Sequence, residues 1–364
     1  MEDMVNMWHG RRVFVTGHTG FKGSWLTLWL TKMGARVCGY ALDPWTDPNM
    51  FTVANVSAAI AEDVRGNTLD REKLEATMTG FAPEVVFHLA AQPLVRRSYA
   101  DPVGTYATNV MGTVHVLEAI RKTPSVRAVV SITTDKCYEN KEWVWPYRET
   151  DSLGGFDPYS SSKACAEIIS AAYRSSFFPV ESLAEHHVAV GTARAGNVIG
   201  GGDWSTDRLI PDLIRGFLSR QPVLIRRPKA VRPWQHVLEP LRGYILLAEQ
   251  LFAQKQQFAS AFNFGPGADD VWSVERIATK IVDAWGNGTK WVLDDNPSVH
   301  EDRYLNLDAS KAHIELGWKP LLKIDPALEW LVSWYRAWEH SENMQDYTLT
   351  QIVKYEQMMK DSHP

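Results

Sequence analysis

The fold is decided by the stretch Arg11-Arg12-Val13-Phe14-Val15-Thr16-Gly17-His18-Thr19-Gly20-Phe21-Lys22-Gly23. Two arginines lead into a short apolar run with β-branched residues that stops at a glycine, which predicts a buried strand. Residues 24–34 are long and apolar enough for a buried helix that ends at Gly34. Residues 36–42 are a second strand pattern, so the three segments predict one β-α-β unit.

The same alternation continues along the chain. Strand patterns cover residues 83–89, 127–133 and 188–194, and helix patterns cover residues 105–121 and 159–173. Strands that alternate with helices at this spacing predict an α/β fold, a doubly wound parallel sheet with right-handed crossovers.

The pattern changes after about residue 198. Residues 222–240 carry four prolines and a cluster of basic residues, which predicts irregular chain, and helical patterns return at 272–364. We expect two domains. The larger comprises residues 10–198 with a return segment at about 232–268, and the smaller, C-terminal one comprises residues 199–231 and 269–364.

The composition excludes several classes of protein. The 38 Lys and Arg and the 43 Asp and Glu give a net charge of −5, and 45% of the residues are hydrophobic. Such a chain can bury a core and is not disordered, and its acidic balance argues against a nucleic-acid or anionic-membrane partner. It has no uninterrupted run of about 18 apolar residues, the length that a membrane-spanning helix needs.

The cysteines and the N-terminus favour a cytoplasmic protein. The three cysteines lack metal-site spacing and cannot all pair, as expected in a reducing compartment. His186, His187 and His300 also lack partners at metal spacing, so we expect no metal. Residues 1–10 are polar and acidic and show no signal-peptide pattern.

Gly17, Gly20 and Gly23 are spaced by three between the first predicted strand and helix. One glycine permits the tight turn, another lets backbone N–H groups approach a pyrophosphate, and the third lets the helix pack on the strand. The anion then lies at the positive N-terminus of the helix. In this context the loop predicts a dinucleotide site, and a purely structural turn is the alternative.

Tyr159 and Lys163 lie at positions i and i+4, on one face of a predicted helix. A Tyr phenol has a pKa of about 10, and a neighbouring ammonium lowers that pKa by favouring the phenolate. Thr133-Thr134-Asp135 precede the pair at a strand end, where ligands of open parallel sheets bind. We predict that Lys163 activates Tyr159 as a base and that Thr134 hydrogen-bonds the reacting hydroxyl. A solvated helix face is the alternative.

Together these motifs resemble the extended short-chain dehydrogenase/reductase superfamily, and within it the nucleotide-sugar 4,6-dehydratases. The resemblance covers roughly residues 10–320. It also rests on Tyr40-Ala41-Leu42-Asp43-Pro44, His88-Leu89-Ala90-Ala91-Gln92-Pro93, Ala195-Gly196-Asn197-Val198-Ile199-Gly200, Arg232-Pro233-Trp234-Gln235-His236-Val237 and Arg303-Tyr304-Leu305. It implies a Rossmann-type NAD-binding domain, a nucleotide-sugar-binding C-terminal domain, and a homodimer formed through the helices at 105–121 and 159–173, for which merely buried helices are the alternative.

The resemblance also implies how NAD is held. In the superfamily the second strand usually ends in an acid that binds the adenosine ribose. Here Ala41 stands at that position and Asp43 follows two residues later. No arginine at this strand tip could neutralise a 2′-phosphate, which favours NAD over NADP. The expected cofactor residues are Gly17, His18, Gly20, Phe21, Lys22, Asp43, Asp63, Val64, Leu89, Ala90, Ala91, Thr133, Tyr159, Lys163 and Arg194.

The implied reaction is an internal oxidation, elimination and reduction. Tyr159 removes the C4 hydroxyl proton while a hydride passes from C4 to NAD, water is lost across C5–C6, and the hydride returns to C6. Asp135 matches the acid that protonates the departing C6 hydroxyl. Lys136 stands where the family commonly has a glutamate that removes the C5 proton. It acts as a neutral base, stabilises the enolate, or relays protons through water.

Overall likeness, including Lys22 and Asp135-Lys136, implies CDP-glucose as the substrate, within deoxyhexose synthesis for a lipopolysaccharide O-antigen. The alternatives are a dehydratase of dTDP-, GDP- or UDP-sugars, a sugar-nucleotide epimerase or net oxidoreductase, and a non-catalytic NAD-binding sensor. Asp135 argues against a simple epimerase, and the retained Tyr159 and Lys163 argue against the sensor. The expected substrate residues are Gln92, Asn197, Arg208, Leu209, Arg232, Trp234, Arg303 and Tyr304.

Overall fold

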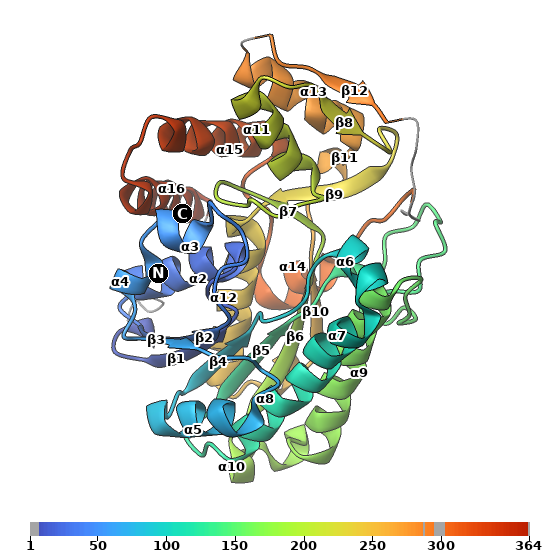
Figure 1. Cartoon of the computed structure of the whole chain (residues 1–364). Coiled ribbons are helices and arrows are strands. Elements are labelled where there is room, and N and C mark those ends of the chain that lie inside the picture. Colours follow the sequence, from blue (N-terminus) through green and yellow to red (C-terminus); the bar gives the residue numbers. More distant parts are fainter. Residues whose placement is uncertain (1–6, 287, 295–302, 363–364) are drawn as a thin grey trace.

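A seven-stranded parallel sheet forms the centre of the protein. The computed structural model describes residues 7–286, 288–294 and 303–362 and is drawn in Figure 1. The strand order is β10-β6-β5-β4-β1-β2-β3, and the order changes direction between β1 and β4. This confirms the predicted doubly wound α/β fold. The strands are β1 (Arg12–Thr16), β2 (Arg36–Ala41), β3 (Glu62–Arg65), β4 (Val85–His88), β5 (Ala128–Ile132), β6 (Ala189–Ala195) and β10 (Ala261–Phe264).

Helices cover both faces of this sheet because its buried strands present apolar side chains to each face. In β1, Val13 and Val15 belong to one apolar cluster and Phe14 belongs to another. The first cluster includes residues of α2 (Phe21–Lys32) and α12 (Leu238–Phe252), and the second includes residues of α5 (Arg71–Phe81), α8 (Gly112–Arg121) and α9 (Pro158–Ser176).

The helix predicted over residues 105–121 is one continuous helical segment built from three elements. These are α7 (Pro102–Tyr106), the π-helical turn η1 (Ala107–Met111) and α8. The remaining short elements are α3 (Met50–Val53), α4 (Val56–Ala59), α6 (Val95–Ala100), η2 (Asp135–Cys137), η3 (Val180–Ser182), α10 (Leu183–His186), η4 (Gln256–Phe258), η5 (Ala268–Asp270) and α14 (Ser310–Leu316).

The prediction of irregular chain at residues 222–240 is wrong. This segment contains β8 (Val223–Ile225), β9 (Val231–His236) and the start of α12. Three of its four prolines occupy tolerant positions, since Pro222 precedes β8, Pro228 lies between the strands, and Pro240 occupies the first turn of α12, where no backbone N–H is needed. Pro233 instead lies inside β9. β9 pairs with β7 (Asn197–Ile199) and β11 (Val271–Ser273), and β8 pairs with β12 (Trp291–Leu293).

The C-terminal part of the chain lies in two places. The two small sheets lie with α11 (Leu209–Ser219) and α13 (Val274–Trp285) beyond the carboxyl ends of the central strands, whereas α15 (Ile324–Glu339) leads to α16 (Met344–Asp361), which returns to α2 (Figure 1). Glu356 of α16 accepts hydrogen bonds from Trp29 Nε1 (2.9 Å) and Lys32 Nζ (2.6 Å) of α2. The last helix is therefore anchored on the central-sheet side of the molecule.

The expected return segment is divided between two parts of the fold. The expected return segment at about 232–268 supplies α12 and β10 to the central sheet and its cover, while its first residues belong to β9 of a small sheet. The boundaries remain a prediction. Within residues 1–10, the first six lie outside the described residues, and so do His300 and parts of the segment 269–364.

Candidate active site

A cleft of about 610 Å³ opens at the carboxyl ends of β1, β4, β5 and β6. Its floor comes from the segments that follow these strands, and its opposite wall comes from residues 203–212 and 223–232. This is the position at which open parallel sheets bind ligands. The cleft brings together the glycine loop, the residues after β5, and the start of α9.

The glycine loop has the backbone that a dinucleotide site requires. Gly17 has φ +77°, and a Cβ there would lie 2.7 Å from the main-chain nitrogen of Ala90. A Cβ on Gly23 would lie 2.1 Å from the carbonyl oxygen of Gly17, so neither position accepts a side chain. Gly20 is the N-cap of α2, which places the free N–H groups of that helix at the cleft. The loop therefore fits the pyrophosphate of NAD.

The end of the cleft near β2 and β3 carries a charged cluster. Asp43 lines the cleft, and its carboxylate accepts a hydrogen bond from Arg65 Nε at 2.9 Å. Arg65 also pairs with Asp63, which in turn bonds the ring of His18 at 2.8 Å. Asp63 and Arg65 share one face of β3 because they are two residues apart.

His18 lies behind the glycine loop and is not among the residues that line the cleft. Its side chain is fully buried, and a Cβ on Gly39 would lie only 2.3 Å from its ring. Burial lowers the pKa of His18, opposed by Asp63. Asp63 and Val64 are likewise absent from the lining. Of the cofactor residues predicted at this end, only Asp43 faces the cleft directly.

All five predicted catalytic residues line the cleft. Thr134, Asp135 and Lys136 follow β5, and Tyr159 and Lys163 lie on the first turns of α9. Thr134 Oγ1 donates to Asp135 Oδ1 at 2.9 Å and is hydrogen-bonded to the Tyr159 phenol. The short turn η2 begins at Asp135 because the Thr134 side chain caps it at the Lys136 N–H.

The Tyr159 pKa is raised, and not lowered as the sequence suggested. Burial raises the pKa of Tyr159 to about 12, although the hydrogen bond with Thr134 and the charge of Arg208 lower it. The Lys163 ammonium instead donates to the carbonyl oxygen of Ile132 at 3.2 Å. Burial lowers the pKa of Lys163 itself to about 8, and Glu167 and Cys137 oppose that shift. Desolvation of the phenolate therefore outweighs the attraction of its neighbours.

Lys22 of the glycine loop is directed into this centre and is not a solvated surface lysine. Its nitrogen lies 5.9 Å from the ring centroid of Tyr244. Burial, followed by the charges of Lys163 and Arg208, lowers the pKa of Lys22 to about 7. Asp135 and Asp203 act in the opposite direction. The loop thus adds a second lysine to the catalytic cluster.

Six of the eight predicted substrate residues line the cleft: Gln92, Asn197, Arg208, Leu209, Arg232 and Trp234. The Gln92 amide is occupied in shaping its own loop, since its Nε2 donates to Leu94 O and to Thr105 Oγ1. Arg303 and Tyr304 are not part of the lining. They contact the loop at residues 140–142 through main-chain atoms.

Several residues that line the cleft were not predicted from the sequence, and arginines are prominent among them. Arg96 and Arg226 come from opposite sides of the cleft and both pair with Asp207, at 3.2 and 3.6 Å. The basic cluster in residues 222–240 was the available signal. Among the other residues predicted to bind the cofactor, the following all line the cleft: Phe21, Leu89, Ala90, Ala91 and Thr133.

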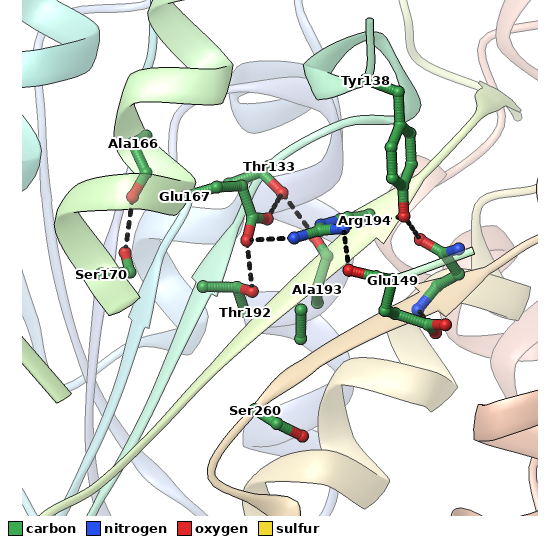
Figure 2. Close-up of polar contacts among 12 residues, drawn as sticks. Thr133, Tyr138, Glu149, Ala166, Glu167, Ser170, Thr192, Ala193, Arg194 and Ser260 are labelled. Atoms are coloured by element: carbon green, nitrogen blue, oxygen red, sulfur yellow. Dashed lines mark hydrogen bonds and ion pairs between the residues drawn. The ribbon is translucent and has the colours of Figure 1, made fainter. Parts of the chain in front are cut away.

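Arg194 was predicted to bind the cofactor, but its side chain is directed away from the cleft and into the protein interior. Its guanidinium pairs with the Glu167 carboxylate and donates to the Tyr138 hydroxyl, and Figure 2 shows Arg194 between these two residues. Its side chain is 4% exposed and is not among the cleft residues. Along β6 the neighbour Ala195 lines the cleft instead, because successive side chains of a strand point to opposite faces.

The described part of the chain contains no group of His, Cys, Asp or Glu residues that could hold a metal ion. Within the same residues, no helix has both the length and the apolar character needed to cross a membrane.

The chain is similar to known proteins along most of its length. The profile of the NAD dependent epimerase/dehydratase family matches residues 13–265. CDP-glucose 4,6-dehydratase of Salmonella typhimurium is 51% identical over 350 residues, which cover 96% of this chain and 97% of the relative. dTDP-glucose 4,6-dehydratase of the same organism is 25% identical over 349 residues, with 90% and 93% covered.

Solved structures agree with the fold. UDP-glucose 4-epimerase of Thermotoga maritima superimposes with a TM-score of 0.77 at 24% identity over 90% of this chain and 99% of that one. dTDP-glucose 4,6-dehydratase of Streptomyces venezuelae, with NAD bound, gives 0.76 at 24% identity over 91% and 98%.

Proposed function

The chain belongs to the NAD dependent epimerase/dehydratase family, and we propose that it converts CDP-D-glucose to CDP-4-keto-6-deoxy-D-glucose and water. The likeness to the CDP-glucose 4,6-dehydratase of Salmonella typhimurium along nearly the whole chain supports this choice of substrate. We propose NAD as the cofactor, held by the glycine loop and Asp43, and CDP-glucose as the ligand of the opposite wall.

One observation carries the proposal: Asp135 and Tyr159 face the same cleft, and Thr134 links them. An oxidation at C4 needs the phenol, as in any reductase of this kind. The loss of a C6 hydroxyl needs a further acid, and Asp135 is a buried carboxyl at the point where the sugar would lie. A C4 epimerase has no use for that acid.

The residues divide the chemistry between them. Bound NAD supplies the reversible hydride acceptor for the sugar. Tyr159, as phenolate, accepts the proton of the C4 hydroxyl, and Thr134 holds that hydroxyl in line. Asp135 donates a proton to the departing C6 oxygen, so that water leaves as the C5–H and C6–O bonds break. Lys136 lies beside it and takes the C5 proton or stabilises the enolate that forms.

The experiment incubates the purified chain with CDP-, dTDP-, GDP- and UDP-glucose in turn and follows each product by mass spectrometry. We expect the loss of one water from CDP-glucose without net reduction of NAD. A product of unchanged mass would indicate an epimerase, and efficient dehydration of another nucleotide sugar would contradict the choice of base. No product from any of them, with NAD still bound, would favour the sensor.

We also propose a homodimer formed through the helical face of α7, η1 and α9. Val103, Met111 and Ile168 are exposed there, at 78%, 46% and 55%. Light scattering on the wild-type chain and on Ile168→Arg tests this: a dimer that becomes a monomer supports the face, and an unchanged dimer contradicts it.

We also propose a cytoplasmic location, which the free thiols of Cys38, Cys137 and Cys165 support, and a role in deoxyhexose synthesis for an O-antigen.

A further inference from the structure

The turn η2 carries Asp135 and Lys136, and both of its flanks are tied to one buried ion pair. Before the turn, the Thr133 hydroxyl donates to Glu167 Oε1. After the turn, the Tyr138 hydroxyl accepts from Arg194 Nη1 at 2.8 Å. Glu167 and Arg194 are themselves joined at 2.9 Å, so the two flanks meet on the same pair (Figure 2).

The pair is almost completely withdrawn from water. The Glu167 and Arg194 side chains are 3% and 4% exposed. Burial alone would raise the pKa of Glu167, but Arg194, Thr133 and Thr192 lower it below its ordinary value, which keeps the carboxylate ionised. Thr192 Oγ1 donates the additional hydrogen bond at 2.7 Å.

The network continues from Tyr138 into the rest of the fold. The Tyr138 hydroxyl donates to Asn263 Oδ1 at 2.7 Å, and Asn263 Nδ2 donates to the carbonyl oxygens of Tyr147 and Asp308. These bonds connect β5, α9, β6, β10 and the loop after the turn. Both carboxylate oxygens of Glu167 and both terminal nitrogens of Arg194 take part in these bonds, and a buried pair held in this way fixes geometry more than it adds stability.

None of Glu167, Arg194 and Tyr138 lines the cleft, so they act on a bound sugar through the residues that they hold, which are Thr133 and the turn η2. Tyr159 and Lys163 enter the cleft from α9, which also carries Glu167, and their own hydrogen bonds go to Thr134 and to the carbonyl oxygen of Ile132. The Glu167 end of the network is thus shared with the helix of the oxidation residues, whereas the Arg194–Tyr138 bond holds the turn from the side away from α9.

From this arrangement we infer that the Glu167–Arg194 pair, through Tyr138, positions Asp135 and Lys136 for the loss of water. The inference rests on the proposed function. These are positioning residues, and the Arg194–Tyr138 connection governs the elimination step more than the hydride transfer that precedes it.

The test is Tyr138→Phe, which removes one hydroxyl and keeps the ring that stacks on Tyr147 at 5.2 Å. In single turnovers with CDP-glucose and NAD, absorbance follows hydride transfer, and quenched samples analysed by mass follow water loss. We expect hydride transfer within about threefold of wild type and water loss slowed about tenfold to hundredfold, since small misplacements have costs of this size. The 4-keto sugar that retains its C6 hydroxyl should accumulate.

Tyr147→Phe is the matched control. It removes the hydroxyl of the stacked neighbour, which bonds Lys141 N and Asn140 within the loop, and we expect both steps to remain near wild type. Arg194→Lys is the second variant. It keeps a cation opposite Glu167, loses the arm that reaches Tyr138, and should slow water loss selectively as well.

Equal slowing of both steps in Tyr138→Phe, or water loss at the wild-type rate in a cooperatively folded variant, would overturn the inference. The wild-type chain separates this from the larger proposal. If the wild type releases no water from CDP-glucose, the proposed function fails and takes the inference with it. If only Tyr138→Phe departs from expectation, the inference alone fails.

Discussion

The ammonium of Lys163 donates to the carbonyl oxygen of Ile132, 3.2 Å away, and so ties α9 to the last residue of β5. This bond holds the helix that carries Tyr159 against the strand end that leads to Thr134. The phenol is therefore placed by the backbone of the sheet. Its ionisation depends on a balance between burial, which raises its pKa to about 12, and the Thr134 and Arg208 side chains, which lower it.

Replacing Tyr159 with Phe should abolish hydride transfer and leave binding of the nucleotide sugar intact. The proton acceptor is lost, whereas the arginines of the opposite wall remain, so a rate loss of about 10²–10⁴ is expected. Single-turnover absorbance and calorimetric titration with CDP-glucose measure the two properties. Tyr173→Phe, on the same helix but bonded to Glu118, is the control. A Tyr159→Phe chain that reduces NAD at the wild-type rate would remove the phenol from its role.

Asp135→Asn should separate the steps in a different way. The amide cannot donate the proton that the departing C6 hydroxyl needs, but the phenol and the lysine are untouched. We expect cofactor reduction to proceed and water loss to fall by about 10²–10⁴, as for other general acids. Quenched-flow mass analysis should find the oxidised sugar before elimination. Normal dehydration by this variant would contradict the assignment.

Lys22 predicts a pH dependence of NAD affinity. Its pKa in the free chain is lowered to about 7, chiefly by burial, and the pyrophosphate favours the ammonium. Affinity should therefore be highest below pH 7 and should decline as the pH rises through 7, by at most about tenfold per pH unit. Titration calorimetry at pH 6 and 8 measures the change. Lys22→Met should flatten it, whereas Lys32→Met, near Glu356, should not. A wild-type affinity that rises with pH would refute this role.

The pairing of Arg65 with Asp43 suggests a change that would shift the cofactor preference from NAD towards NADP. Its guanidinium is bound by Asp43 and Asp63, so its charge is neutralised beside the carboxylate that we propose holds the adenosine ribose. Asp43→Asn should free Arg65, weaken NAD binding and improve NADP binding, each by several-fold. Fluorescence titration with both dinucleotides gives the ratio, and Asp47→Asn, exposed in the same loop, serves as the control. An unchanged ratio of the two affinities would show that Arg65 takes no part in selectivity.

The sequence predicted the central sheet well because its strands are short apolar runs that end at glycine or at polar site residues. β3 escaped because Glu62–Arg65 is an edge strand with exposed, charged residues and no apolar run. β8 and β9 escaped because prolines obscured their periodicity, and Pro233 lies inside β9, the middle strand of its small sheet, where proline is rarely found.

The sequence predicted those site residues that directly follow a strand of the central sheet. The carboxyl ends of parallel strands meet at one edge of the sheet, so the topology alone brings these residues together. Tertiary pairing was not predictable. Arg194 holds its family position, yet strand alternation directs it to Glu167 and away from the cleft. The pairing of Arg96 with Asp207 joins residues that no periodicity connects. Burial of Tyr159 likewise depends on the assembled fold, so its raised pKa could not be read from the lysine four residues away.

The decisive measurement follows an isotope through one turnover. CDP-glucose carrying deuterium at C4 is converted by the wild-type chain with unlabelled NAD, and the product is analysed by mass spectrometry and NMR. We predict a product lighter by one water that carries the deuterium at C6, because the hydride leaves and returns within one closed cleft. A product that keeps all its oxygens, or one that lacks the label at C6, would contradict the proposed dehydration.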